Sequence, residues 1–189
     1  MEKFDHKAVE HLKSGNVILC LTDTIWGLSA DAGNEAAAKT IVEIKERPVN
    51  KSFIVLVSSV DMLANYFDGP IPPSCFRELT QYNRPTTVIL PRVIGLAPTV
   101  YAHDGTVGVR ICKFTPLNQI IQAFGQPIIS TSANLSGQSN PRSFKDIDLK
   151  IKQRVNYIVK HKTEEKPYLS KPSRIVKWLG DDSFKTLRP

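Results

Sequence analysis

The sequence predicts an α/β protein in which helices cover a twisted, mixed, open β-sheet, and three observations predict it. At about 150 residues per domain, the 189 residues fit one domain spanning 1–189 better than two, and 41% apolar residues suffice for a full core. Short apolar runs alternate with segments of helical periodicity. Several predicted strands follow one another over hairpin-length links, so parallel and antiparallel pairs are expected in the same sheet.

The first predicted elements are a helix and a buried strand. Asp5 can cap the free N–H groups of the helix, and Gly15 ends it. The apolar run 17–21 (VILCL) lies between turn signals, which is typical of a strand covered on both faces. Asn34 caps a second helix with one apolar face, and Pro48 is expected to end that helix.

In the rest of the chain, the sequence pattern predicts two more helices and seven strands. A short helix follows Ser59, and a proline-rich segment covers 69–85. The clearest helix has Thr115 as its cap, Pro116 as its first residue and Gly125 as its stop. Strands are predicted from β-branched and apolar runs at 53–57, 86–90, 106–111, 127–130, 155–159, 174–178 and 184–187.

Composition argues against several classes of protein. The three cysteines, Cys20, Cys75 and Cys112, are odd in number and lack C-x-x-C spacing, so neither a disulfide framework nor a zinc site is predicted. The longest apolar runs have five residues, far fewer than the ~20 that cross a bilayer. The charged N-terminus leads into no apolar segment typical of a signal peptide. We therefore expect a cytoplasmic protein that does not enter a membrane.

The net charge of +7 is concentrated in the second half of the chain. Residues 95–189 carry 15 basic and 7 acidic side chains, whereas residues 1–94 carry 10 and 11. Such an excess suits a polyanionic partner such as a nucleotide or RNA. A solvated basic face without a partner explains the charge equally well.

Four polar clusters stand next to predicted strands, where ligands of open α/β sheets usually bind. The chain has no G-x-x-x-x-G-K-[ST], G-x-G-x-x-G or H-E-x-x-H motif, so any nucleotide must be held in another way. The clusters are 22–28 (TDTIWGL), 45–52 (KERPVNKS), 106–110 (TVGVR) and 130–137 (STSANLSG).

Each cluster also has a purely structural interpretation. Segment 22–28 reads equally well as a capped turn beside a core tryptophan. Lys45 can compensate the dipole of the helix that it ends, whereas the cations of 45–51 together can converge on phosphates. Arg110, pointing from a central strand, needs either a structural carboxylate or a substrate carboxylate. The hydroxyls of 130–137 suit oxyanions, or a solvent-exposed loop.

Taken together in this order and spacing, the four clusters and 84–90 (RPTTVIL) resemble the YrdC-like family over essentially the whole chain, from about residue 5 to 189. The length matches the short, single-domain TsaC type. The resemblance implies an α/β sheet around a deep, positively charged cavity. It also implies an enzyme, a nucleotidyltransferase that joins L-threonine, bicarbonate and ATP into threonylcarbamoyl-AMP and pyrophosphate. The product serves the threonylcarbamoyladenosine modification of tRNA.

The resemblance also implies roles for individual residues. Those matching the threonine site are Thr24, Arg110, Ser132 and Ser173. Those matching the ATP site are Arg47, Lys51, Thr106, Ser130, Ser132, Asn134, Arg142 and Arg188. The catalytic cations are expected to be Arg47, Lys51 and Lys45. Mg²⁺ is expected to be held by phosphates and water, with no metal ligands from the protein.

Two other functions stay open at this point. The basic residues of 142–189 also suit a double-stranded RNA-binding protein without catalysis, and a regulatory relative could keep the pocket without turnover. For the enzyme, we expect transfer of the product to a downstream threonylcarbamoyl transferase complex, with contact to tRNA possible. The enzyme hypothesis requires that 45–51 and 130–136 meet over one hollow.

Overall fold

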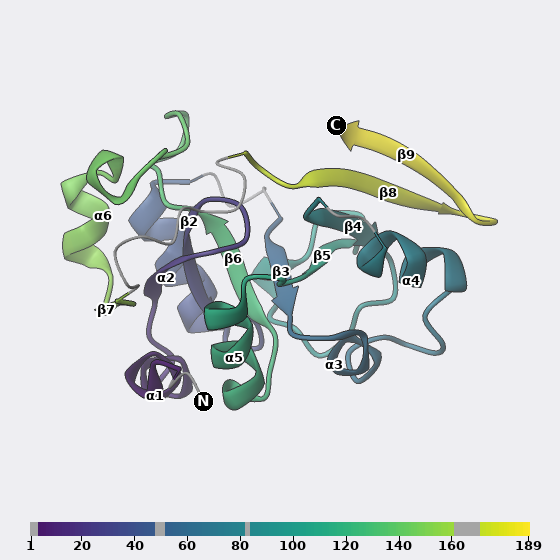
Figure 1. The fold of residues 1–189 in the computed structure, drawn as a ribbon, viewed down its shortest axis with the longest axis horizontal. Coiled ribbons are helices and arrows are strands. Elements are labelled where there is room, and N and C mark those ends of the chain that lie inside the picture. Colours follow the sequence, from purple (N-terminus) through teal and green to yellow (C-terminus); the bar gives the residue numbers. More distant parts are fainter. Residues whose placement is uncertain (1–3, 48–51, 82–83, 161–170) are drawn as a thin grey trace.

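The computed structural model describes residues 4–47, 52–81, 84–160 and 171–189, and these residues form one mixed sheet of nine strands (Figure 1). The order across the sheet is β7-β1-β2-β6-β3-β5-β4-β8-β9. The strands are β1 (Ile18–Leu21), β2 (Trp26–Asp31), β3 (Ile54–Val57), β4 (Thr86–Leu90), β5 (Val107–Ile111), β6 (Ile128–Ser132), β7 (Tyr157–Ile158), β8 (Arg174–Gly180) and β9 (Ser183–Arg188).

Parallel and antiparallel pairs occur together, as predicted. The pairs β1–β7, β3–β5 and β4–β8 are parallel, and the remaining neighbours are antiparallel. The long β8–β9 hairpin forms one end of the sheet (Figure 1). The predicted α/β class with a mixed sheet is therefore confirmed.

Helices cover both faces of this sheet. On one face, α1 (His6–Lys13) and α5 (Thr115–Phe124) share a hydrophobic cluster with the sheet. On the other, α2 (Glu35–Lys45), α3 (Val60–Ala64) and α4 (Pro73–Thr80) contribute to a larger cluster. The short α6 (Leu149–Arg154) lies near α2, and two 3-10 turns cover Pro98–Val100 and Phe144–Asp146.

The two faces follow from the alternation of side chains along each strand. In β1, Ile18 and Cys20 pack in the α1/α5 cluster, whereas Leu19 between them packs in the α2 cluster. In β3, Leu56 belongs to the α1/α5 cluster and its neighbours to the other. We call the side of the sheet that carries α1 and α5 the α1/α5 face.

Local signals placed most helix ends correctly. The Asp5 side chain accepts from the N–H of Ala8 at 3.3 Å, and Asn34 caps α2 in the same way. Gly125 ends α5 with a φ of 82°, a conformation that favours glycine. The predicted start of α5 was wrong by one residue: Phe114 occupies the cap position, and Thr115 is the first helical residue. The expected stop at Pro48 was also wrong: α2 ends at Lys45, where Glu46 takes a left-handed conformation with a φ of 50°, before Pro48, which lies outside the described residues.

Other differences concern elements without a clear local signal. Strand β2 starts at Trp26, inside the segment 22–28 that the sequence indicated as a turn, because β1 and β6 pair with it on both sides. Helix α4 lies inside the proline-rich segment and starts with Pro73. The predicted strand 155–159 is reduced to the two residues of β7, because only these two pair with β1, opposite Ile18 and Leu19.

Candidate active site

A cavity of about 690 Å³ opens on the α1/α5 face of the sheet, beyond the helices. Along β6, the side chains on this face change from Ile128, packed in the helix cluster, to Ser130 and Ser132, which line the cavity. Along β5 they change from Cys112 at the strand's end to Arg110 and Gly108. The side chains on this face are therefore apolar under the helices, and they are small or polar where no helix covers the sheet.

Glycine makes room in the floor of the cavity. A Cβ on Gly108 would lie 3.1 Å from Cγ2 of Thr87, closer than ordinary contact. A Cβ on Gly27 would lie 3.1 Å from the carbonyl oxygen of Thr131. Both glycines line the cavity, so side chains here would take space from a ligand.

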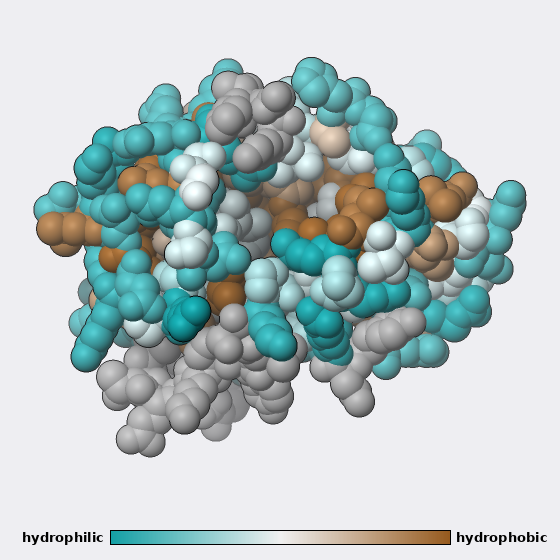
Figure 2. All heavy atoms as spheres, turned by 90° about the horizontal axis from the view of Figure 1, so that it is seen from above, coloured by the Kyte–Doolittle hydropathy of each residue, from teal (hydrophilic) through white to brown (hydrophobic). Residues whose placement is uncertain are grey.

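Figure 2 shows hydrophobic residues reaching the surface in the middle of one face, with hydrophilic residues on both sides.

Arg47 marks one end of the cavity. Its guanidinium lies 4.5 Å from the centre of the Phe53 ring and donates to the carbonyl of Ser52. Nη1 lies 3.5 Å from the hydroxyl of Thr131, while Nε is buried without a hydrogen-bond partner. Burial lowers the pKa of Arg47 from its ordinary value. Arg47 is therefore a partly dehydrated cation on the cavity wall.

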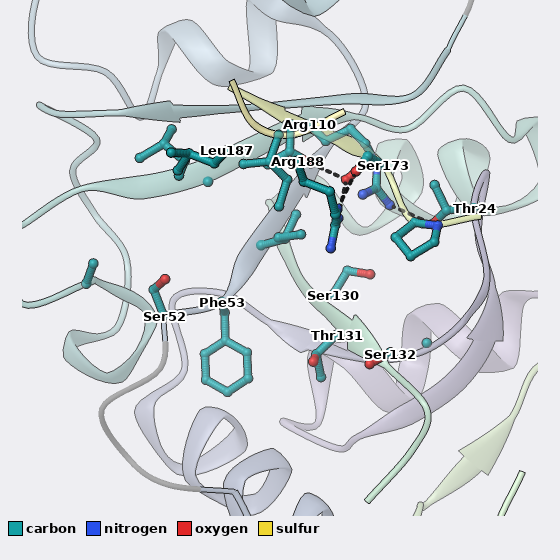
Figure 3. A pocket seen from close by; sticks show the side chains of 18 of the residues that line it. Thr24, Ser52, Phe53, Arg110, Ser130, Thr131, Ser132, Ser173, Leu187 and Arg188 are labelled. Carbon is teal, nitrogen blue, oxygen red and sulfur yellow. Dashed lines mark hydrogen bonds between the residues drawn. The ribbon is translucent and has the colours of Figure 1, made fainter. Parts of the chain in front are cut away.

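Ser130, Thr131 and Ser132 of β6 face this end of the cavity (Figure 3). The Ser132 hydroxyl donates to Oδ1 of Asn134. The Asn134 side-chain amide donates to the carbonyl of Gln138 at 2.6 Å. The loop after β6 is therefore closed by its own side chains, which fixes the hydroxyls that precede it.

Lys45 braces this loop from behind. Its side chain is buried, and Nζ donates to the carbonyls of Ser132 and Asn134, the latter at 2.6 Å, and to Asn134 Oδ1 at 3.3 Å. The carbonyl of Lys45 in turn accepts from the N–H of Ser136 at 2.8 Å. Lys45 is not among the residues that line the cavity. Its ammonium shapes the hydroxyl loop instead of facing a ligand.

Thr24 and Arg110 mark a second end of the cavity (Figure 3). Arg110 Nη2 lies 3.0 Å from Asp23 Oδ1 and 3.4 Å from the hydroxyl of Thr24. The Thr22 hydroxyl closes the turn by accepting from the N–H of Thr24 at 3.1 Å and donating to the carbonyl of Ile25 at 2.8 Å. This turn delivers Asp23 and Thr24 to the guanidinium together.

Arg188 enters the same region from the last strand. Its Nε donates to the carbonyl of Ser173 at 2.8 Å, and Nη2 to the Ser173 hydroxyl at 3.2 Å. Ser173 is 1% exposed, and its hydroxyl also contacts Thr87 Oγ1 at 2.8 Å. Burial, and to a smaller extent the charges of Arg110 and Arg84, lower the pKa of Arg188. In Figure 3 the Arg188 side chain extends from Ser173 toward Ser130.

A third part of the cavity wall combines charge with an apolar surface. The Asp104 carboxylate contacts Lys177 Nζ at 2.7 Å and accepts from the Thr106 hydroxyl at 2.6 Å. Hydrogen bonds from Lys177 and Thr106 hold the pKa of Asp104 well below its ordinary value. The apolar residues beside them are Ile89, Ile175 and Leu187.

The structure brings most of the predicted site residues to one cavity. Those that line it are Thr24, Arg47, Thr106, Arg110, Ser130, Ser132, Ser173 and Arg188. Lys45 and Asn134 lie behind it, Arg142 is exposed outside it, and Lys51 lies outside the described residues. The required meeting of 45–51 with 130–136 is thus met by Arg47 and the β6 serines.

Sequence reasoning missed several residues of the cavity wall. Thr87 and Lys177 share the cavity face of β4 and β8, and Phe53 supports Arg47. Alternation along the predicted strand 86–90 gave a signal for Thr87, but not which face would carry the cavity. Among the described residues, no group of three or more His, Cys, Asp or Glu side chains could hold a metal ion. No helix in the described ranges is long and apolar enough to cross a membrane.

The fold and the cavity define the class of protein. The chain belongs to the Sua5/YciO/YrdC family, because the family model Sua5_yciO_yrdC, described as telomere recombination, matches residues 10–189. The resemblance to the YrdC-like family is thereby confirmed. A Xanthomonas axonopodis pv. citri (strain 306) protein named Threonylcarbamoyl-AMP synthase is 36% identical over 173 residues, which cover 89% of this chain and 90% of the relative.

Two solved structures share the fold. Escherichia coli YciO matches with a TM-score of 0.78 and 24% identity over 96% of this chain and 86% of YciO. P. abyssi Sua5, solved in complex with L-threonine, matches with a TM-score of 0.86 and 23% identity over 97% of this chain and 53% of Sua5. This chain therefore spans about half of the P. abyssi protein.

Proposed function

We propose that this chain is an L-threonylcarbamoyladenylate synthase, which forms threonylcarbamoyl-AMP and pyrophosphate from L-threonine, bicarbonate and ATP. One observation carries the proposal: Arg47 and the β6 hydroxyls share a cavity with Arg110 and Arg188. The relatives agree with it, since the Xanthomonas protein has the name of this activity and P. abyssi Sua5 was solved with L-threonine.

The charge of the cavity suits these substrates. Among the described lining residues, four are cationic, namely Arg47, Arg110, Lys177 and Arg188, against one carboxylate, Asp104. All three substrates carry negative charge, and guanidinium groups recognise both carboxylate and phosphate oxygens. A volume of about 690 Å³ lies in the range of small-molecule sites.

The two ends of the cavity divide the substrates between them. Threonine binds at the Thr24 and Arg110 end, with Ser173 acting through its contacts to Arg188 and Ser132 reaching the amino acid from β6. The triphosphate binds at the Arg47 end against the hydroxyls of Ser130 and Ser132. Thr106, on the third part of the wall, and Arg188, at the Arg110 end, contact the rest of ATP. This assignment places the threonine amine beside the α-phosphate.

The chemistry needs no covalent enzyme intermediate. The threonine amine takes up bicarbonate with loss of water, giving an N-carboxylate. A carboxylate oxygen then attacks the α-phosphorus of ATP, the bond to the β-phosphate oxygen breaks, and pyrophosphate leaves. The protein's task is to align the reactants and to stabilise the charge on the phosphoryl oxygens.

Arg47 is the catalytic residue that the geometry favours most. Its Nε has no hydrogen-bond partner, and its guanidinium is held by Phe53 and Ser52. Lys45 supports catalysis by holding the loop of Ser132 and Asn134. Lys51, from the same segment, is proposed as a second phosphate-binding cation, and Arg142 as a further contact at the mouth. Mg²⁺ enters with ATP, bound to its phosphates and water, because the described residues offer it no ligand cluster.

The product is an activated intermediate, so a transferase must consume it. We place that step in a downstream threonylcarbamoyl transferase complex that modifies tRNA in the cytoplasm. Direct contact between tRNA and this chain is not required by the chemistry.

A pyrophosphate assay tests the function. The purified protein is incubated with ATP and bicarbonate, with and without L-threonine, and the nucleotide product is identified by mass. Threonine-dependent release of pyrophosphate with threonylcarbamoyl-AMP is expected. The absence of turnover, together with tight double-stranded RNA binding that weakens steeply with salt, would instead favour the RNA-binding alternative.

A further inference from the structure

Asp23 and Arg110 form an ion pair that is almost completely buried. Asp23 is 2% exposed and Arg110 is 3% exposed, with 3.0 Å between Oδ1 and Nη2. Arg110 lines the cavity, whereas Asp23 does not. The carboxylate therefore stands behind the guanidinium, on the side away from the ligand space.

Stability does not explain this pair. Taking two charges out of water carries a large desolvation cost, and packed apolar residues of similar size are often as stabilising as a buried ion pair. An apolar side chain could pack at this depth in the sheet, since Leu56 of β3 is the register partner of Arg110 and is fully buried. A role in holding Arg110 for a ligand accounts for the pair better.

The contacts of Asp23 fix it from two elements. The Thr22 hydroxyl closes the turn that carries Asp23, with 2.8 Å to the carbonyl of Ile25. The second oxygen, Oδ2, lies 3.5 Å from the backbone N–H of Lys113, just beyond β5. Asp23 thus ties the β1–β2 turn to the end of the strand that carries Arg110, and its carboxylate has a defined position.

The contacts of Arg110 use only part of its donor set. Nη2 donates to the Thr24 hydroxyl at 3.4 Å and forms an ion pair with Asp23 Oδ1 at 3.0 Å, in which Oδ1 has no hydrogen-bond partner among the described residues. Nε is buried and has no hydrogen-bond partner. A buried donor without a partner is costly, so the protein contacts leave the guanidinium with donor capacity that they do not use. In Figure 3, Arg110, Thr24 and Arg188 converge on one end of the cavity.

Asp23 also reduces the positive charge that gathers at this end. Arg188 is the second guanidinium there, and the charge of Arg110 opposes the protonated form of Arg188. One carboxylate behind Arg110 offsets this repulsion without occupying the space in front. The cavity then keeps an excess of positive charge for an anionic group.

We propose that Asp23 is a positioning residue that holds Arg110 through the ion pair with Nη2, so that the guanidinium meets the carboxylate of the amino acid substrate. This inference rests on the proposed function, since it takes the substrate to be an amino acid. It predicts that removing the Asp23 charge weakens threonine binding selectively. ATP, whose phosphates lie at the Arg47 end, should bind as before.

Asp23→Asn tests the proposal against Asp61→Asn, the same change at an exposed position on α3. Asp23→Asn is expected to raise the KM and the calorimetric Kd for threonine by about 10- to 100-fold, as loss of an outer-shell partner does at metal sites. The KM for ATP should change by less than about threefold. An unchanged threonine KM, or an equal loss for both substrates, would overturn the proposal.

A double-mutant cycle separates positioning from a merely structural role. If Asp23 acts through Arg110, then Asp23→Asn combined with Arg110→Lys should bind threonine no more weakly than the worse single variant. Independent roles would multiply the two losses, and that result would also overturn the proposal. Circular dichroism and the ATP Kd report whether each variant is folded.

Asp23→Glu keeps the test decisive if the asparagine variant does not fold. It retains the charge but moves the carboxylate by one methylene, so threonine affinity should fall while the fold is kept. Wild-type affinity in this variant would contradict a positioning role. Failure of the proposed function can be told apart from failure of this inference. If the function is wrong, the wild-type protein releases no pyrophosphate with threonine. Calorimetric binding of threonine still tests the role of Asp23 in that case.

Discussion

The α1/α5 face of the sheet consists of two regions that share the same strands but differ in what covers them. Under the helices, Ile18, Leu56 and Ile128 pack against α1 and α5 in a cluster with no exposed members. Beyond the helices, Gly108, Arg110 and Ser130 line a cavity of about 690 Å³. A few residues along one strand thus separate the core from the site.

The difference teaches how a continuous sheet serves both stability and binding. In β5 and β6 the residues that alternate onto this face are small or polar at one end of the strand and apolar at the other. The covered region is held by apolar packing, whereas side chains in the bare region are held by polar contacts such as those of Arg110 with Asp23 and of Arg188 with Ser173. We expect substitutions in the covered region to change stability, and substitutions in the bare region to change activity.

The largest expected effect is a loss of stability from Leu117→Ala in the covered region. Leu117 of α5 is fully buried, and alanine keeps the helix propensity, so the cost comes from the cavity left behind. The free energy of unfolding should fall by about 3 to 5 kcal/mol in chemical denaturation. Leu149→Ala, at a 64% exposed position of α6, is the control and should cost less than about 1 kcal/mol.

Arg47→Ala should give the next largest effect, on activity instead of stability. Loss of one charge-stabilising donor typically lowers kcat by about 10²–10³. The measurement is threonine-dependent pyrophosphate release, with the unfolding midpoint followed in parallel. Arg77→Ala, an exposed arginine on α4, should behave as wild type. Unchanged kinetics of Arg47→Ala would remove Arg47 from the mechanism.

Features set by neighbouring residues in the chain could be predicted from the sequence. Asp5 and Asn34 are caps because their oxygens reach N–H groups three residues on, and Gly125 ends α5 through a local conformation. Strand β2 could not be predicted in this way. Its Gly27 and Ser29 have low strand propensity, and only pairing with both β1 and β6 makes this segment a strand.

The same distinction applies to the site. Arg110 could be identified because a guanidinium that points from a predicted central strand needs an anionic partner. The contact between Thr87 and Ser173 joins residues 86 positions apart, and it depends on the parallel pairing of β4 with β8. Lys45 looked like a phosphate-binding cation, but the carbonyls that surround its ammonium come from a loop 87 to 89 residues later. Long-range partners of this kind leave no local pattern.

Gly108→Ala should have a smaller effect on substrate binding, and it tests the bare region by changing only the shape of the cavity. The new Cβ would lie 3.1 Å from Thr87 Cγ2 in the cavity floor, without adding charge or removing a donor. We expect the KM of a substrate to rise by about tenfold, near the cost of one misplaced methyl group. Gly33→Ala, outside the cavity with 3.4 Å to its nearest neighbour, is the control. Tight threonine and ATP binding by Gly108→Ala would mean that ligands do not reach the floor.

The smallest effect concerns Cys20, which reports on the dryness of the covered region without changing function. Burial, only partly offset by the hydrogen bond with Ser29, raises the pKa of the Cys20 thiol to about 11. Because the folded pKa lies above the unfolded one, this group contributes stability below pH 9, and the contribution is lost as pH rises from 9 to 11. At pH 8 only about one thiol in 10³ is ionised at such a pKa, so the folded protein should react with iodoacetamide at least about 100-fold more slowly than the denatured chain. A thiol introduced by Ser132→Cys in the bare region should be alkylated readily, and bound ATP should protect it. Equal reactivity of this thiol and Cys20 in the folded protein would mean that water enters the covered region as freely as the cavity. The two regions of this face would then not differ as described.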